Sequence, residues 1–184
     1  MRSIFSLTCL IVIVGITNGQ QLPEYNNSAT AWNSKSNVST PLTPEEAVRK
    51  DKMNSSYNVP YGSLFSKKAA MKTFMQLNGP KSKSRTVADD SIKIFVKIDK
   101  DTDPKGVIKI YKTALENNNR EAYVMQVSKK GEVQRSDGDY NYSLNKMSPG
   151  LFQVNVVGVK AGDELLFYLG THEAALAKLT LGID

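Results

Sequence analysis

Three aspartates on alternate residues form the part of this sequence that most resembles a metal site. Asp99, Asp101 and Asp103 lie in the stretch IDKDTDPKG. Carboxylates at this spacing begin the calcium loop of an EF-hand, because calcium takes about six to eight oxygen ligands. The rest of the loop departs from that pattern, since Pro104 holds the glycine position and Ile110 holds the position of the bidentate acid.

A turn is the alternative interpretation of the same aspartates, and the flanking residues favour it. Asp and Pro are typical turn residues, and the segments on both sides are typical of strands, where an EF-hand needs helices. Lys97, Lys100 and Lys105 also place positive charge beside the acids. Calcium therefore stays the less favoured hypothesis, in which loop carbonyls and Asp137 or Asp139 would complete the site.

Two tyrosines could bind a sugar. Tyr140 and Tyr142 lie on one face of an expected strand, and a pair of exposed rings could stack on a carbohydrate. The alternative is that both rings, with Leu144, form the apolar face of a sandwich strand.

Residues typical of catalysis are scarce. His172 is the sole histidine and Cys9 the sole cysteine, and no G-x-S-x-G motif or glycine-rich phosphate loop is present. We therefore expect a protein that is not an enzyme and that needs no cofactor, calcium aside.

The first nineteen residues have the layout of a secretory signal peptide. Arg2 precedes the apolar run IFSLTCLIVIVGI, and Thr17-Asn18-Gly19 offers small residues for cleavage. Cleavage between Gly19 and Gln20 would remove Cys9, so the mature protein would contain no disulfide. The expected location is secreted or periplasmic.

Positive charge is concentrated in one segment. The chain has 24 basic and 18 acidic residues. Seven of the basic residues lie between Lys52 and Ala88, where Asp and Glu are missing. The predicted partner-binding residues are Lys67, Lys68, Lys72, Lys81, Lys83 and Arg85. An anionic membrane surface, an acidic glycan or an acidic protein would suit them, and no motif for reading nucleic acid is present.

Two kinds of segment are expected before the main domain. Residues 20–60 are rich in Asn, Ser, Thr and Pro and predict a disordered polar linker, interrupted by a short helix that begins at Thr43 in a capping box with Glu46. Residues 61–88 predict an amphipathic basic helix, from Ser63 to Leu77, and a basic linker.

From Asp90 onward the sequence is typical of an all-β domain. Ile92, Ile94, Val96 and Ile98 alternate with Lys93, Phe95 and Lys97, and turn signals such as Ser136-Asp137-Gly138-Asp139 separate further β-prone stretches. About seven strands in residues 89–184 predict an antiparallel β-sandwich of immunoglobulin-like size.

The last hundred residues resemble a known group of proteins. The stretches IKIFVKIDKDTDPKGVIKIYK, KMSPGLFQVNV and AGDELLFYL are similar to the carboxy-terminal β-domain of small uncharacterised exported proteins of Bacteroidota-type bacteria. The resemblance implies a location in the cell envelope or outside the cell, and it brings no catalytic residue.

Together these features predict an exported, non-catalytic β-sandwich protein with a binding or structural role. The partner would be a protein or a glycan in the envelope or the extracellular space. The alternative is a module that binds carbohydrate or calcium.

Overall fold

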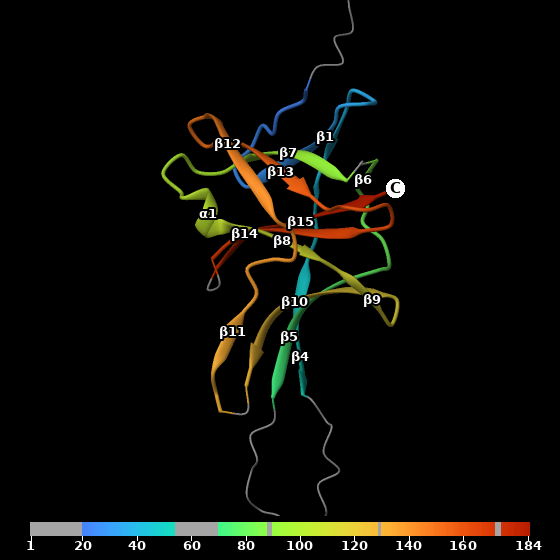
Figure 1. Ribbon diagram of the computed structural model, residues 1–184, viewed down its shortest axis with the longest axis vertical. Coiled ribbons are helices and arrows are strands. Elements are labelled where there is room, and N and C mark those ends of the chain that lie inside the picture. Colours follow the sequence, from blue (N-terminus) through green and yellow to red (C-terminus); the bar gives the residue numbers. More distant parts are fainter. Residues whose placement is uncertain (1–19, 54–69, 88–89, 129, 172–173) are drawn as a thin grey trace, which may run out of the picture.

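The chain folds almost entirely into β-strands (Figure 1). The computed structural model describes residues 20–53, 70–87, 90–128, 130–171 and 174–184. Its strands are β1 (Ser28–Asn33), β2 (Val38–Pro41), β3 (Thr43–Pro44), β4 (Ala47–Met53), β5 (Met71–Leu77), β6 (Arg85–Thr86), β7 (Ser91–Lys97), β8 (Ile108–Lys112), β9 (Ala114–Glu116), β10 (Asn119–Val127), β11 (Val133–Arg135), β12 (Tyr142–Ser148), β13 (Leu151–Val157), β14 (Glu164–Gly170) and β15 (Ala175–Ile183). One short helix, α1 (Pro104–Val107), is found in the described residues.

The strands form three sheets. Sheet A has the order β12-β13-β7-β1-β2, and sheet B has the order β3-β15-β14-β8 with β6 beside β15. Sheet C has the order β11-β10-β5-β4, with β9 beside β10. The pairs are antiparallel apart from the parallel pair of β6 and β15.

Sheets A and B pack face to face around the main hydrophobic core. The alternation predicted for Ile92, Ile94 and Val96 on β7 is confirmed, because all three side chains are buried in this core. Phe167 on β14 and Leu181 on β15 meet them from sheet B. Full burial of one such side chain is worth about 1.5–3 kcal/mol.

Sheet B is covered on both faces. On β14, Leu165, Phe167 and Leu169 belong to the core shared with sheet A, whereas Leu166 and Tyr168 belong to a second cluster. That cluster contains Leu77 and Ala122 of sheet C. The near-continuous apolar run of β14 is therefore typical of a strand with two buried faces.

Sheet C extends away from the sandwich, and its strands lie in the lower half of Figure 1. The end of the sheet that carries Leu77, Ala122, Ala47 and Met75 packs on sheet B. The other end leads toward residues 54–69, which lie outside the described residues.

The prediction of a helix over Ser63–Leu77 is wrong for residues 71–77. These residues form β5, the strand that lies between β4 and β10. Met75 and Leu77 face sheet B while Phe74 contacts Tyr123 on the opposite face. When a strand has apolar residues on both faces, their spacing can resemble that of a helix. Here pairing with the two neighbouring strands favours the strand over the helix.

The prediction of disorder over residues 20–60 is wrong for residues 28–53, which contain β1 to β4. Ala29 and Ala31 are small, yet both are buried in the main core because β7 holds β1 in place. Thr43 begins β3 instead of a helix, and Glu46 forms no capping box there. The segments 1–19 and 54–60 lie outside the described residues.

The coarse prediction of a mainly β protein with antiparallel sheets is confirmed, but the strand number is not. The described residues contain fifteen strands in three sheets, and nine of them, β7 to β15, lie in residues 90–184, where about seven are expected. No helix in the described part of the chain has the length and apolar character needed to cross a membrane.

Candidate functional site

The outer face of sheet A carries side chains that could bind a polar ligand. The inner face packs on sheet B, so alternate residues of the same strands point away from the core. The strand register places five of these residues in one row across the sheet: Ser39, Trp32, Lys93, Asn155 and Ser143. Because neighbouring strands lie about 4.8 Å apart, this row is roughly 19 Å long.

Hydrogen bonds align the amide side chains of the row. The Asn155 Nδ2 group donates to Ser143 Oγ at 3.3 Å, and Gln153 Nε2 donates to Asn155 Oδ1 at 2.7 Å. These three residues lie on β12 and β13, and none of them is fully buried. Their remaining donors and acceptors are thus positioned for a ligand that lies along the sheet.

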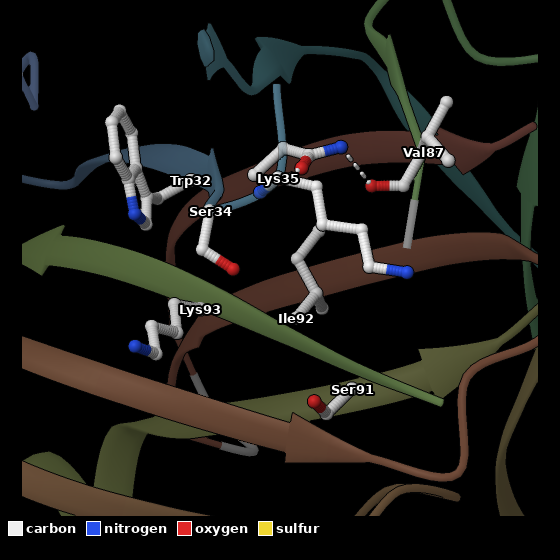
Figure 2. Close-up of a pocket in the computed structure, with 8 residues that line it drawn as sticks. Trp32, Ser34, Lys35, Val87, Ser91, Ile92 and Lys93 are labelled. Atoms are coloured by element: carbon white, nitrogen blue, oxygen red, sulfur yellow. Dashed lines mark hydrogen bonds between the residues drawn. The ribbon is translucent and has the colours of Figure 1, made fainter. Parts of the chain in front are cut away.

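A hollow of about 240 Å³ lies beside Trp32 (Figure 2). Its described lining residues are Trp32, Asn33, Ser34, Lys35, Val87, Ser91, Ile92 and Lys93. Figure 2 shows Trp32 and Lys93 on one side of the hollow and Val87 on the other. The lining combines one indole ring, two lysines and hydroxyl groups, and none of these eight residues is acidic.

Asn33 holds the wall of this hollow together. Its Nδ2 group donates to the backbone oxygen of Val87 at 2.7 Å. Its Oδ1 atom accepts from the backbone N–H groups of Lys35 at 2.9 Å and Ser36 at 3.1 Å. One side chain therefore fixes the turn between β1 and β2 and joins it to the segment that leads into β7.

The other end of the outer face is covered. Thr30 and Phe95 point outward, yet they are 4% and 0% exposed. The segment 21–27 crosses this end: Gln21 N donates to Ser39 Oγ at 2.9 Å, and Lys97 Nζ donates to the backbone oxygen of Glu24 at 2.6 Å. Ser39, at the edge of the row, is bonded to this segment, so the open part of the face is restricted to Trp32, Lys93, Asn155 and Ser143.

The sequence patterns do not identify this site, because they place Trp32 in a segment predicted to be disordered. The available signal was the alternation of Ala29 and Ala31 with Thr30 and Trp32. It ends at Asn33, one of the residue types that favour turns. A strand followed by a hairpin turn could have been inferred from these two features.

The predicted sugar-stacking tyrosines face inward. Tyr140 and Tyr142 both pack against the core between sheets A and B. The Tyr140 hydroxyl donates to Asp163 Oδ2 at 2.6 Å, and the Tyr142 hydroxyl donates to the backbone oxygen of Ile108 at 2.7 Å. Burial raises the pKa of both hydroxyl groups, and for Tyr140 the bond to Asp163 adds to this effect. Their alternative interpretation, as part of an apolar strand face, fits these contacts.

Two of the three aspartates of IDKDTDPKG, Asp99 and Asp103, organise turns. Asp99 Oδ1 accepts from the backbone N–H of Asp101 at 3.1 Å, and Asp103 Oδ1 accepts from that of Lys105 at 3.1 Å. Asp103 is the N-cap of α1. Within the described ranges no group of three or more His, Cys, Asp or Glu residues could hold a metal ion.

The predicted basic residues do not form one helical patch. Lys67 and Lys68 lie outside the described residues, and Lys72 lies on β5. Lys81 and Lys83 are exposed between β5 and β6. Arg85 instead forms ion pairs with Glu164 and Asp184, both at 2.6 Å, and these partners raise its pKa.

Comparison with known proteins adds no functional assignment. The sequence matches no protein-family model and no curated protein. The candidate function therefore rests on the chemistry of the residues described above.

Proposed function

We propose that this chain is an exported, non-catalytic binding protein that binds carbohydrate on the open part of the outer face of sheet A. One observation carries the proposal: the half-buried indole of Trp32 lies in a row with Lys93, Asn155 and Ser143 on an open sheet face. An aromatic ring can stack on the apolar face of a sugar ring. Amide, hydroxyl and ammonium groups can bind the sugar hydroxyls around it.

The hollow beside Trp32 has room for a small ligand or for one sugar unit of a longer carbohydrate. Its volume of about 240 Å³ is below the range of about 300–1,000 Å³ that encloses drug-sized ligands. The ligand would therefore lie mainly on the surface, with one group in the hollow. The bonds of Asn33 to Val87 and Lys35 hold this geometry before binding, which lowers the entropic cost of association.

Export is part of the proposal, and it rests on the sequence of residues 1–19 and on the resemblance to exported proteins. Intact mass of the protein recovered from the periplasm or the medium of an expressing bacterium would test it. A chain that begins at Gln20 is expected. Recovery of the chain only from the cytoplasm, still beginning at Met1, would contradict export.

Trp32 provides a direct test of binding, because it is the only tryptophan of the chain. Tryptophan fluorescence, excited at a wavelength where tyrosine does not absorb, therefore reports on the proposed site alone. Screening on a glycan array would first identify a ligand. Titration of that ligand should then shift or quench the Trp32 emission in a saturable way.

Variants then test the residues, with affinity measured by calorimetry. Trp32→Leu should weaken binding by more than about tenfold, and Asn155→Ala by less, because stacking on the ring is lost only in the first. Trp32→Phe keeps a ring and should retain most of the affinity. Leu115→Ala, at an exposed position on β9, is the control and should bind as the parent does. Unchanged binding by Trp32→Leu would refute the proposed site.

A further inference from the structure

A second exposed face, on sheet C, combines lysines with aromatic rings. The register of β4, β5 and β10 places nine residues in a three-by-three grid that we call the lysine-aromatic face. Its rows are Val48, Gln76 and Glu121; Lys50, Phe74 and Tyr123; and Lys52, Lys72 and Gln126. Alternate residues on the same strands, such as Leu77 and Ala122, pack on sheet B. The lysine-aromatic face is therefore the solvent side of sheet C.

Each ring on this face has an ammonium group near it. Lys52 Nζ lies 4.8 Å from the centre of the Phe74 ring, and Lys72 Nζ lies 6.0 Å from that of Tyr123. The two rings contact each other edge to face, with centres 5.8 Å apart. Cation–π attraction of this kind helps to hold the lysines near the rings. The attraction is weaker at solvent-exposed sites than at buried ones.

Positive charge exceeds negative charge on the lysine-aromatic face. It contains three lysines and one carboxylate, Glu121, which is 4% exposed. Glu121 accepts from Lys50 at 2.9 Å and from Lys52 at 2.5 Å. Lys72 forms no ion pair with a carboxylate of the described residues. The face thus offers an anion at least one uncompensated charge, on a side chain that is exposed.

We infer that the lysine-aromatic face binds an acidic polysaccharide. Sulfate or carboxylate groups would pair with Lys72 and the neighbouring lysines, and apolar sugar faces would contact Phe74 and Tyr123. The amide group of Gln126 lies on the same face for the sugar hydroxyls, as does the amide oxygen of Gln76, whose Nε2 donates to Glu121 at 3.1 Å. Charge complementarity and the flat shape of a sheet both suit an extended polymer.

An anionic membrane fits this face less well. Interfacial binding depends on apolar side chains that enter the acyl boundary. Phe74 and Tyr123 are only partly exposed, and ammonium groups lie near both rings. The two rings therefore lie in the protein surface, where a ligand could cover them. They do not project far enough to enter the acyl region of a membrane.

Binding to dextran sulfate and to neutral dextran of equal length, in about 0.15 M NaCl, tests the inference with the mature chain. The sulfated polymer should bind and the neutral one should not. The variant Lys50→Gln, Lys52→Gln, Lys72→Gln, Glu121→Gln should bind dextran sulfate more than about tenfold more weakly. Glu121 is replaced with the lysines so that no unpaired carboxylate is left buried.

A matched control separates this face from the general positive charge of the chain. Lys100→Gln with Lys160→Gln removes the same net charge, two units, at exposed positions outside sheet C. An equal loss of affinity in both variants would overturn the inference. If the fourfold variant does not fold, Lys72→Glu can be tested in its place, because it breaks no ion pair among the described residues. Unchanged binding of dextran sulfate by Lys72→Glu would also overturn the inference.

Two further readouts distinguish the alternatives. Tighter binding to phosphatidylglycerol vesicles than to dextran sulfate, lost in the fourfold variant, would assign the face to a membrane and overturn the inference. Trp32 lies on sheet A, so its fluorescence should not respond to dextran sulfate, and Trp32→Leu should bind that polymer normally. Failure of the sheet A proposal would leave these expectations unchanged.

Discussion

Arg120 and Glu45 form an ion pair across the junction of sheets B and C, with 2.5 Å between Arg120 Nη2 and Glu45 Oε2. The Arg120 side chain is 1% exposed. It also donates to Ser82 Oγ at 2.7 Å and to the backbone oxygen of Gly79 at 3.1 Å. The second oxygen of Glu45 accepts from Thr180 on β15 at 2.5 Å. One carboxylate thus joins a strand of sheet B to a strand of sheet C.

Replacing Arg120 by Met should destabilise the fold by about 3–5 kcal/mol, because Glu45 would keep its charge in a partly buried place without its cation. Urea unfolding, followed by circular dichroism, measures this change. The double variant Arg120→Met, Glu45→Gln should recover part of the loss, since it removes the unpaired charge.

An exposed ion pair provides the control. Arg49 and Asp51 lie on β4 with side chains 61% and 40% exposed. Arg49→Met should cost less than about 1 kcal/mol. A similar loss for Arg49→Met and Arg120→Met would mean that burial does not determine the importance of the pair.

The Arg120 contacts illustrate why part of the fold could not be predicted from the sequence. Glu45 and Arg120 are 75 residues apart, and nothing local marks them as partners. The alternation of Ile92, Ile94 and Val96 has a period that local geometry dictates, so β7 could be predicted. For residues 71–77 the local pattern fits a helix as well as a strand, and only pairing with β4 and β10 excludes the helix.

The candidate sites also differ in how far the sequence alone predicts them. The turn role of Asp99 and Asp103 could be predicted, because each carboxylate bonds to the backbone two residues further on. The rows that contain Trp32 on sheet A and Phe74 on sheet C could not. Each row joins residues from strands far apart in the sequence, and the strand register alone places them side by side.

The stability of the fold should fall in acid because of Glu121. Burial by itself would raise the pKa of this carboxyl group, but hydrogen bonds from Lys52 and Lys50 outweigh it and hold the pKa below its ordinary value of 4.5. The unfolded state then binds more protons than the folded state between the two pKa values. The contribution is therefore complete above the unfolded pKa of 4.5 and is lost as pH falls through the lower folded value.

Urea unfolding at a series of pH values from about 7 to 3 tests this sign. The parent should lose stability progressively below the unfolded pKa. Glu121→Gln should be less stable at neutral pH and show a smaller decrease in acid, because its amide does not titrate. The variant should still lose some stability in acid, because the pKa values of Asp163 and Glu164 are also lowered in the folded state. Parallel curves for the two proteins would contradict the role of Glu121.

Calcium should not change the thermal stability of the protein. The Asp99 and Asp103 carboxylates each accept a backbone N–H, and among the residues placed by the structure no acidic cluster suits a metal ion. A ligand that binds only the folded state raises Tm. Melting of the mature chain with millimolar calcium and with EDTA should therefore give the same Tm. A shift that Asp101→Asn abolishes would establish a calcium site in this loop.

A chain that begins at residue 90 should not fold on its own, although the sequence alone predicts a separate domain over residues 89–184. Sheet A would lose β1 and β2, and sheet C would lose β4 and β5, two of the strands in its main order. Val96 and Ile94 on β7 would then be uncovered at the edge where β1 pairs. Burial of such side chains contributes about 1.5–3 kcal/mol each, a large part of a typical folding free energy of about 5–15 kcal/mol.

Two-dimensional NMR of the chains 20–184 and 90–184 measures the outcome. The longer chain should give dispersed amide signals, whereas the shorter should give the narrow dispersion of an unfolded chain. Dispersed signals from both would show that β1 to β5 dock on a domain that is already complete.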